Sequence, residues 1–209
     1  MKINTAVFFG GRSVEHEVSV ITGVQAIMSL DREKYNIIPV YIAKDGAMYS
    51  GDVLFDIDNY KDLNKLCAAA KKVTILSENG KAVMKYAKKR GFTDKKQVEL
   101  DVALHAVHGT KCEDGALQGF FELLGLAYVG PDVLSSAVGM DKAVFKKIMA
   151  ANNLPVLPCI ELSARRYAQS AKEAFDSIEK NIGFPVIVKP VNLGSSVGIS
   201  KANNQAELL

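Results

Sequence analysis

Apolar residues follow two different patterns near the start of the chain. The apolar run at 3–9 is rich in strand-forming residues and ends at two glycines, which predicts a strand followed by a tight turn. Between 14 and 30, apolar residues recur at helical spacing over about half of the helix circumference, which predicts a helix packed on a sheet. A second apolar run at 37–43 completes a strand–helix–strand unit. The apolar positions of this helix are Val14, Val18, Val20, Ile21, Val24, Ile27 and Met28.

A third apolar run, at 98–107, is continuous, which is typical of a parallel strand buried on both faces. A helix bearing apolar residues over 117–124 and a strand at 126–129 follow it. The intervening residues 45–97 are patchy and rich in lysine, and we expect short hairpins there together with a helix near 60–70. This order of elements predicts an α/β fold with a Rossmann-like parallel sheet.

A glycine and a proline at 130 and 131 interrupt the pattern, and we place a domain boundary there. The predicted domains are residues 1–130 and residues 131–209, the second of them of α+β type. The elements expected in the second domain are a helix capped by Asp141, a helix over 164–180, and strands at 185–188 and 197–200.

The composition excludes several classes of protein. Of the 209 residues, 48% are hydrophobic and 23% are charged, which is the balance of a globular domain rather than of a disordered chain. No apolar run approaches the roughly 18 residues that a membrane helix needs, and the N-terminal apolar stretch is too short for a signal peptide. We therefore expect a cytoplasmic protein with no membrane partner.

Charge and cysteine content add two more exclusions. Residues 61–96 carry ten lysines and one arginine against three acidic residues, although the whole chain has a net charge of only +3. This stretch lacks a recognised nucleic-acid-binding pattern, so we interpret it as a solvated lysine-rich face and expect no nucleic-acid partner. The three cysteines are far apart and include no CxxC pair, so we expect reduced thiols and no zinc site.

The first candidate site is the glycine turn between the opening strand and its helix. Backbone amides at such a turn and at a helix N-terminus can bind an anion or a polar ligand, although Gly10 and Gly11 are also compatible with a plain tight turn. Glu15 lies at the mouth of the turn and off the apolar stripe, where it could hold a substrate ammonium. The alternative is that this carboxylate only complements the helix dipole.

The three histidines differ in their positions along the elements. His105 lies inside an apolar run, which favours a core histidine with satisfied hydrogen bonds. His108 lies at the carboxyl end of that strand, where open α/β sheets bind ligands, so we consider it a candidate ligand contact. We expect His16 to be a surface residue.

Two lysines and one loop predict a site for phosphate groups. Lys142 directly follows a helix cap, where its charge opposes the helix dipole, and Lys189 directly follows an apolar strand, so both would be compensated by an anion. An ion pair or a solvated head is the alternative for Lys142. The glycine- and serine-rich loop at 193–198 offers amides and hydroxyls to phosphates, or is simply a flexible hairpin turn. Together these features point to ATP.

Four sequence blocks then resemble the D-alanine–D-alanine ligases of the ATP-grasp superfamily. The blocks are VFFGGRSVEHEVSVITG at 7–23, VHGTKCEDGALQGFFELLGLAYVG at 107–130, SSAVGMDK at 135–142 and GFPVIVKPVNLGSSVGISK at 183–201. The resemblance covers nearly the whole chain except 45–97. It implies a pre-ATP-grasp domain followed by an incomplete α+β ATP-grasp domain. It also implies that ATP phosphorylates a first D-alanine, whose acyl phosphate is attacked by the amino group of a second.

The resemblance also implies roles for individual residues. Glu15 would bind the ammonium of the first D-alanine together with Gly11, and His108 would stabilise the reacting carboxylate and the acyl phosphate. Ser195 matches a serine that hydrogen-bonds with the glutamate and fixes the loop over the site. The residues that would contact the ATP phosphates are Lys142, Lys189, Gly194, Ser196 and Val197.

Cofactors and partners follow from the same resemblance. ATP and Mg²⁺ are the expected cofactors, with the metal ligands expected beyond residue 209, so that no metal ligand is assigned in this chain. We expect a homodimer formed through the N-terminal domain.

The resemblance leaves the identity of the second substrate open. Because the chain ends within the ATP-grasp part, we expect it to be truncated and unable to complete a turnover by itself. The alternatives are a ligase that joins D-alanine to D-serine or D-lactate, or a non-catalytic module that binds a nucleotide or an amino acid.

Overall fold

The computed structural model describes residues 1–87 and 97–208, and the chain divides into two units, Met1–Ala137 and Val138–Leu209. This division lies seven residues beyond the boundary expected at 130. The part of the lysine-rich stretch from 88 to 96 lies outside the described residues. No helix in the described ranges is long and apolar enough to cross a membrane.

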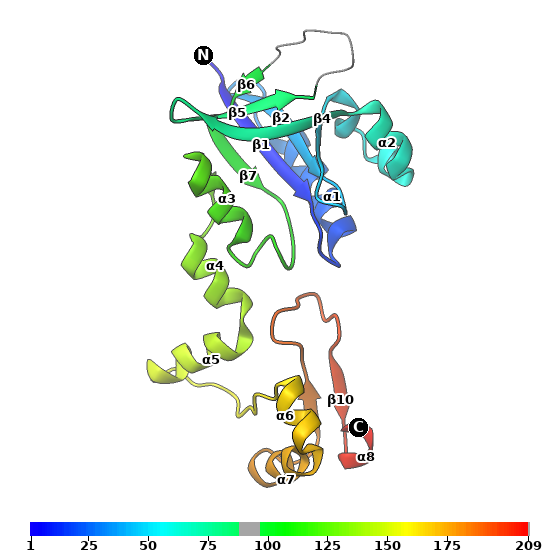
Figure 1. Ribbon diagram of the computed structural model, residues 1–209, viewed down its shortest axis with the longest axis vertical. Coiled ribbons are helices and arrows are strands. Elements are labelled where there is room, and N and C mark those ends of the chain that lie inside the picture. Colours follow the sequence, from blue (N-terminus) through cyan, green and yellow to red (C-terminus); the bar gives the residue numbers. More distant parts are fainter. Residues whose placement is uncertain (88–96, 209) are drawn as a thin grey trace. The chain divides into compact units, whose positions relative to one another are not determined.

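The first unit is built on a mixed sheet, which within the described residues has the strand order β6-β5-β4-β3-β2-β1-β7-β8 (Figure 1). Four neighbouring strands are parallel, as expected for the α/β fold: β1 (Ile3–Gly10), β2 (Tyr35–Ile42), β7 (Val102–His105) and β8 (Ala127–Val129). The other four extend the sheet in antiparallel fashion: β3 (Met48–Ser50), β4 (Lys71–Glu78), β5 (Lys81–Tyr86) and β6 (Gln97–Glu99). The fold class is therefore confirmed, with an antiparallel extension on one side of the parallel strands.

The apolar run at 98–107 is not the single strand that its continuity predicts. Its first part is β6, which is antiparallel to β5, and its second part is β7, which is parallel to β1. The chain changes neighbours between them, because the Leu100 amide bonds to the Ala82 carbonyl and the Asp101 amide bonds to the Asn4 carbonyl. Hydrophobicity alone predicts burial here and does not reveal this change of partner.

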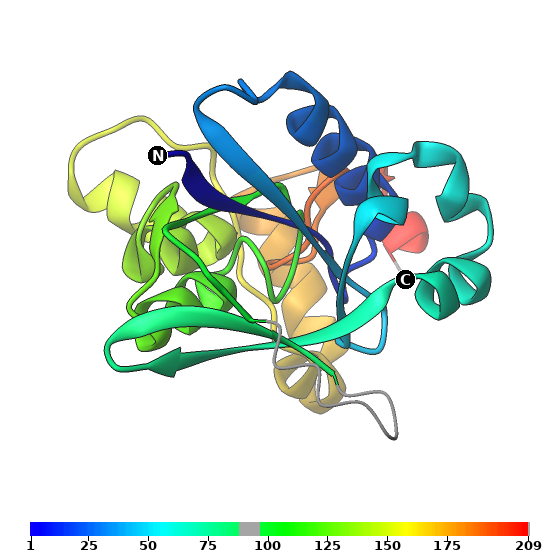
Figure 2. The same cartoon turned by 90° about the horizontal axis from the view of Figure 1, so that it is seen from above.

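Helices cover both faces of the parallel strands. Alternate residues of β1 point to opposite faces, so Phe8 joins the core beneath α3 (Ala116–Leu124) and Phe9 joins the core beneath α1 (His16–Ser29). Figure 2 shows α1 and α2 on one side of the sheet and α3 on the other. Both glycines at the end of β1 therefore lie where the sheet meets the start of α1.

Only part of the predicted apolar face of α1 is buried. Val20, Val24 and Ile27 face the sheet as predicted. The other predicted core residues of this helix are more than half exposed, because a helix lying on a sheet contacts it along one face only. These exposed residues are Val18 (52%), Ile21 (51%) and Met28 (62%), together with Val14 (60%), which lies in the turn before α1.

The lysine-rich elaboration has the short hairpins and the helix that were expected for it. Strands β4 and β5 form a hairpin through Asn79 and Gly80, both with positive φ. The predicted helix is α2 (Leu63–Ala69), and the Asp62 side chain caps it by accepting from the Lys65 amide. Two short 3₁₀ helices, Asp52–Phe55 and Ile57–Lys61, precede it.

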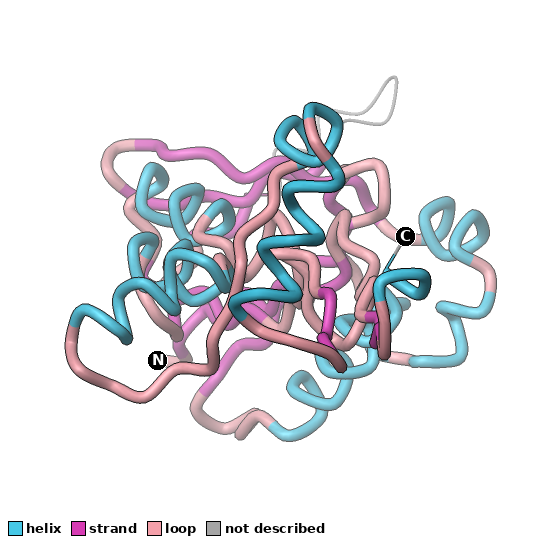
Figure 3. The backbone as a smooth tube through the Cα atoms, turned by 90° about the horizontal axis from the view of Figure 1, so that it is seen from below, coloured by secondary structure: helices cyan, strands magenta, loops and turns pink. Residues whose placement is uncertain are grey.

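The second unit is a smaller set of helices around a two-stranded antiparallel sheet. The helix predicted after Asp141 is α5, and the amides of Ala143 and Val144 in its first turn bond to the Asp141 carboxylate. The helix predicted over 164–180 is broken at Ser170, whose hydroxyl caps the second piece by accepting from the Glu173 amide. Figure 3 shows the helices, strands and loops along the described backbone. The elements are α4 (Val133–Met140, which spans the boundary between units), α5 (Lys142–Ala151), α6 (Ala164–Gln169), α7 (Ala171–Asn181), β9 (Val186–Val188), β10 (Ser200–Ala202) and α8 (Gln205–Leu208).

Candidate functional site

The glycine turn after β1 is held by hydrogen bonds inside the protein. Gly10 and Gly11 have φ values of 90° and 100°, which residues other than glycine rarely adopt. The Gly10 amide donates to the Ser19 hydroxyl at 2.8 Å, and the Gly11 amide donates to the Ile42 carbonyl at 2.8 Å. These two amides, which the sequence pointed to as ligand donors, are therefore already satisfied, and the glycines shape the turn through their backbone conformation.

Glu15 lies at the carboxyl edge of the sheet, against the loop that follows β7. Its side chain is buried, with the residue only 8% exposed, and its amide donates to the Ser13 hydroxyl at 3.1 Å. A Cβ placed on Gly109 would lie 2.6 Å from Glu15 Oε2, so the carboxylate rests directly on that glycine. The structure thus brings the predicted ammonium ligand next to the residue that follows His108.

The ring of His108 is oriented from α1. Its Nε2 lies 3.0 Å from the Thr22 hydroxyl, and its backbone carbonyl accepts a hydrogen bond of 2.6 Å from the Ser13 hydroxyl. Its Nδ1 lies 3.8 Å from Glu113 Oε1, while Glu113 Oε2 accepts from the Gly109 amide at 2.7 Å. The His108 side chain is 29% exposed, so a ligand can reach it, while these contacts hold the ring in place.

Three hydroxyl groups that received no role from the sequence hold this edge together. Ser19 is fully buried and donates to the Ala106 carbonyl at 2.7 Å while accepting from Gly10, so it joins the ends of β1 and β7. Ser13 and Thr22 connect α1 and the turn before it to His108. Ser19 and Thr22 are three residues apart in a helix, and this spacing on one face was the signal available in the sequence.

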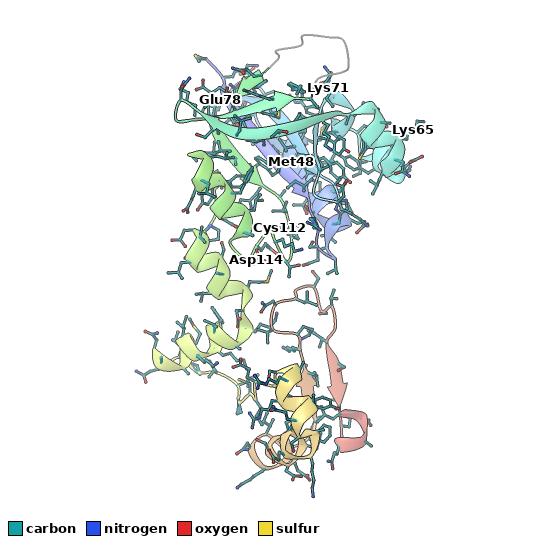
Figure 4. The ribbon with its side chains drawn as sticks, viewed as in Figure 1. Met48, Lys65, Lys71, Glu78, Cys112 and Asp114 are labelled. Carbon is teal, nitrogen blue, oxygen red and sulfur yellow. The ribbon has the colours of Figure 1, made fainter. Side chains whose placement is uncertain are left out.

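The loop after β7 also packs under the glycine turn (Figure 4, where Cys112 and Asp114 are labelled). A Cβ on Gly11 would lie 2.9 Å from Cys112 Sγ, so this thiol fills the space beneath the turn. Burial raises the pKa of the Cys112 thiol to about 11. As expected, all three cysteines are free thiols.

His105 differs from its predicted role as a satisfied core histidine. Its Nε2 is buried and has no hydrogen-bond partner among the described residues, and a Cβ on Gly130 would lie only 2.7 Å from it. Burial lowers the pKa of His105 below its ordinary value of 6.5. The ring therefore packs as a neutral aromatic group against Phe121, at a centroid distance of 6.2 Å.

This burial predicts a pH dependence of stability. Below pH 6.5 the unfolded chain binds a proton at His105 that the folded chain does not bind, so the free energy of unfolding falls as the pH decreases from there. We expect His105→Leu to make that decrease shallower, and to leave stability unchanged or higher at neutral pH because no polar atom is left unpaired. Urea unfolding at about pH 7.5 and about pH 5.5 measures the effect. An equal decrease in the free energy of unfolding between these two pH values for both proteins would contradict the prediction.

Lys142 donates to backbone carbonyls at and just before the start of the loop at 193–198. Its ammonium donates to the Val191 carbonyl at 3.3 Å and also to the Leu193 carbonyl, and its amide donates to Val191 as well. The Asp141 carboxylate is used instead to cap α5, so the alternative of a local ion pair with Lys142 is not what the structure shows. Lys142 therefore lies beside the loop that was predicted to contact phosphates.

The loop itself has an unusual backbone. Ser195 and Ser196 both have positive φ values, 48° and 59°, and the Val197 amide donates to the Gly194 carbonyl at 3.0 Å. The Ile199 amide donates to the Ser196 carbonyl at 3.2 Å. The loop is thus a pair of tight turns rather than an open hairpin end, and the role of Val197 as a phosphate donor stays a prediction.

Lys189 does not leave a buried strand. In β9, Val186 is buried, whereas Ile187 is 52% and Val188 is 43% exposed. Lys189 itself is exposed, because the described part of this sheet has two strands and its faces are incompletely covered. The argument that burial demands a counter-charge at Lys189 is therefore wrong, although the lysine remains available to an anion.

The predicted residues thus form two groups, each within one unit. Glu15, Gly11 and His108 meet at one edge of the first unit, and Lys142 lies with residues 193–198 in the second. Sequence comparison matches most of both units to one family. The profile described as "D-ala D-ala ligase N-terminus" matches residues 4–131, and the profile described as "D-ala D-ala ligase C-terminus" matches residues 148–209.

The chain belongs to the D-alanine–D-alanine ligase family. It is 42% identical over 200 residues to the D-alanine–D-alanine ligase of Thermosipho melanesiensis, covering 95% of this chain and 52% of that protein. It is 40% identical over 208 residues to the enzyme of Natranaerobius thermophilus, covering 100% of this chain and 55% of that protein. The chain therefore spans about half the length of these relatives.

Solved structures of this family have the same fold as the chain. The D-alanine–D-alanine ligase of Coxiella burnetii matches with a TM-score of 0.82 and 31% identity over 99% of this chain and 56% of that one. The VanG D-Ala:D-Ser ligase of Enterococcus faecalis matches with a TM-score of 0.75 and 30% identity over 100% of this chain and 57% of that one. Both confirm the predicted α/β architecture.

Proposed function

We propose that this chain is the substrate- and phosphate-binding portion of a D-alanine–D-alanine ligase, which joins two D-alanines through a D-alanyl phosphate. The observation that carries the proposal is the position of the Glu15 carboxylate against Gly109, next to His108. An anionic group and an imidazole at one edge of the sheet suit the two charged ends of an amino acid. Glu15 would accept hydrogen bonds from the ammonium, and the His108 ring would stabilise the carboxylate.

The second unit supplies groups that suit the phosphates of ATP. Phosphoryl transfer depends mainly on positioning and on neutralising charge, which lysine ammonium groups provide. In this proposal Lys142 and Lys189 contact phosphate oxygens, while Gly194, Ser196 and Val197 contribute donors from the loop. Ser195 would hydrogen-bond with Glu15 to hold the loop over the first substrate. The closed loop would exclude water, which would otherwise hydrolyse the acyl phosphate.

Magnesium has no evident site in the portion described. No group of three or more His, Cys, Asp or Glu side chains in residues 1–87 and 97–208 is arranged to hold a metal ion. The use of Mg²⁺ with ATP stays part of the proposal, and no step here is assigned to the metal.

Calorimetry with residues 1–209 tests the proposed substrates directly. We expect D-alanine to bind more tightly than L-alanine, and ATP to bind independently of the amino acid. A D-serine- or D-lactate-joining ligase would share the first D-alanine site, so the similarity to VanG does not change this expectation. Equal binding of D- and L-alanine would contradict the ligase proposal and favour a general binding module.

Two substitutions should separate the two sites. Glu15→Gln should weaken D-alanine binding by about tenfold or more, because a charge-assisted hydrogen bond is lost, and it should leave ATP binding unchanged. Lys189→Ala should do the reverse. Glu17→Gln, in the first turn of the helix that follows Glu15, and Lys201→Ala, on the strand paired with the one that precedes Lys189, are matched controls, since both residues are exposed. If either control reproduced its partner's effect, the assignment of that site would fail.

We also propose that the protein is a homodimer paired through its first unit, as the family resemblance implies. The exposed apolar side chains of α1 are compatible with such a contact. Sedimentation velocity across a range of concentrations tests this, and a single monomeric species at high concentration would contradict it.

A further inference from the structure

His16 is a buried residue, although it was expected at the surface. It is 1% exposed and lies on the face of α1 that carries Val20, Val24 and Ile27, one turn before Val20. This helical spacing was the signal in the sequence that placed it inside. A buried imidazole needs hydrogen-bond partners for both ring nitrogens.

Both nitrogens have such partners. Nδ1 lies 2.7 Å from the Gly11 carbonyl oxygen, and Nε2 lies 3.1 Å from the hydroxyl of Tyr41, which is 1% exposed. A carbonyl oxygen only accepts, so the hydrogen of the first bond must be on Nδ1. In the neutral ring Nε2 then accepts, and Tyr41 must be the donor. Burial raises the pKa of Tyr41 above its usual value of 10, so the phenol keeps the hydrogen that it donates.

We propose that His16 is a positioning residue for the Glu15 site, locked in the Nδ1–H tautomer by Tyr41 so that it holds the Gly11 carbonyl. The Gly11 amide is bound to Ile42 on one side, and His16 binds the carbonyl on the other, so both polar groups of Gly11 are held. The turn that starts there leads through Ser13 to Glu15, and Ser13 also holds the His108 carbonyl. The relay from Tyr41 therefore determines how the segment bearing Glu15 leaves β1. This inference rests on the proposed function only where it concerns D-alanine.

Nitrogen NMR of the protein labelled with ¹⁵N-histidine tests the tautomer. The chain has three histidines, which single substitutions can assign. At a pH where all three rings are neutral, we expect His16 Nδ1 to resonate as a protonated nitrogen and Nε2 as an unprotonated one. A proton on Nε2 would overturn the proposal whatever the chain binds.

Two substitutions at His16 separate positioning from packing. The amide nitrogen of asparagine is attached where Nδ1 is in histidine, so His16→Asn can still donate to Gly11, whereas His16→Leu cannot. We expect the leucine variant to weaken D-alanine binding by about tenfold and the asparagine variant by no more than about threefold, with ATP binding unchanged in both. Equal weakening by both variants would contradict a hydrogen-bonding role.

A second pair of variants keeps the test valid if the leucine variant does not fold. Tyr41→Phe removes the hydroxyl that donates to His16. Tyr60→Phe removes a hydroxyl of a neighbouring ring, and among the contacts described this hydroxyl donates only to the Leu54 carbonyl. We expect Tyr41→Phe to shift the Gly11 amide resonance and to weaken D-alanine binding by about threefold, and Tyr60→Phe to do neither. Identical behaviour of the two variants would overturn the relay. If the unsubstituted chain bound no D-alanine, the proposed function would fail, while the tautomer and the Gly11 resonance would still decide the role of His16.

Discussion

Phe121→Ala is expected to cost about 3–5 kcal/mol in the free energy of unfolding, the largest effect of any substitution considered for this protein. Phe121 is fully buried in α3, and its ring lies 4.8 Å from that of Phe8 and 5.7 Å from that of Tyr128. Truncation would open a cavity under the sheet, where the surrounding strands cannot collapse. Urea unfolding monitored by circular dichroism measures the loss.

The adjacent aromatic residue provides the control. Phe120 is only partly buried and lines a shallow surface groove with Gly119 and Leu123, and Leu123 is 86% exposed. Phe120→Ala should therefore cost roughly 1 kcal/mol, because little buried area is lost. Equal losses for the two variants would show that α3 does not pack on the sheet as the structure describes.

Gly23→Ala is expected to destabilise the protein by at least about 2 kcal/mol, although alanine is the better helix former. Gly23 lies in α1 directly over Phe9, and an added Cβ would overlap with the Cβ and Cγ atoms of that side chain. Phe9 is fully buried among other aromatic rings, so it has no space into which to move. The helix would have to lift from the sheet, and it carries Ser19 and Thr22 with it.

A second helical glycine should respond in the opposite direction. Gly119 lies in α3, where an added Cβ would meet nothing nearer than a Val133 methyl group at 4.0 Å. Gly119→Ala should therefore stabilise the protein by about 0.5–1 kcal/mol through helix propensity alone. Thermal and urea unfolding of both variants give the signs, and a stabilising Gly23→Ala would contradict the close approach of α1 to β1.

The first strand–helix–strand unit was predictable because its signals are local. The run at 3–9, its glycine pair and the following amphipathic stretch lie next to one another in the sequence, and the structure has β1, the turn and α1 in that order. The run at 98–107 was misread because the partner of a buried strand is a non-local property. Nothing in its residues distinguishes the part that pairs with β5 from the part that pairs with β1.

Burial was predicted less well than element order. The apolar residues at 14–30 were all assigned to one packed face, yet α1 presents only one face to the sheet, so Val18, Ile21 and Met28 stay exposed, and Val14 is exposed in the turn before the helix. His16 shows the converse, since it was expected at the surface while its position on the buried face of α1 places it inside. The exposure of Lys189 depends on which elements pack around β9, and the apolar pattern of one strand does not reveal them.

The sequence indicates some residues of the candidate site but not the contacts between them. The residues Glu15 and His108 follow from the resemblance and from their positions at strand ends, but the sequence does not show that one touches the loop of the other. The helical spacing of Ser19 and Thr22 indicates only that they share a face, because the bonds that join Ser13, Ser19 and Thr22 to the β7 side of the site reach backbone or ring atoms more than eighty residues away. Such long-range contacts are a result of the fold, and a pattern of types along the chain does not encode them.

The antiparallel extension of the sheet leaves one end of the first unit open to modification. The β4–β5 hairpin turns at Asn79 and Gly80, and nothing lies within 4 Å of an added Cβ on Gly80. Figure 4 shows Glu78, beside this turn, at the opposite end of the unit from Cys112 and Asp114. A fluorescent label or an affinity tag inserted at this turn would therefore allow the protein to be imaged or immobilised without contacting the residues proposed to bind substrate.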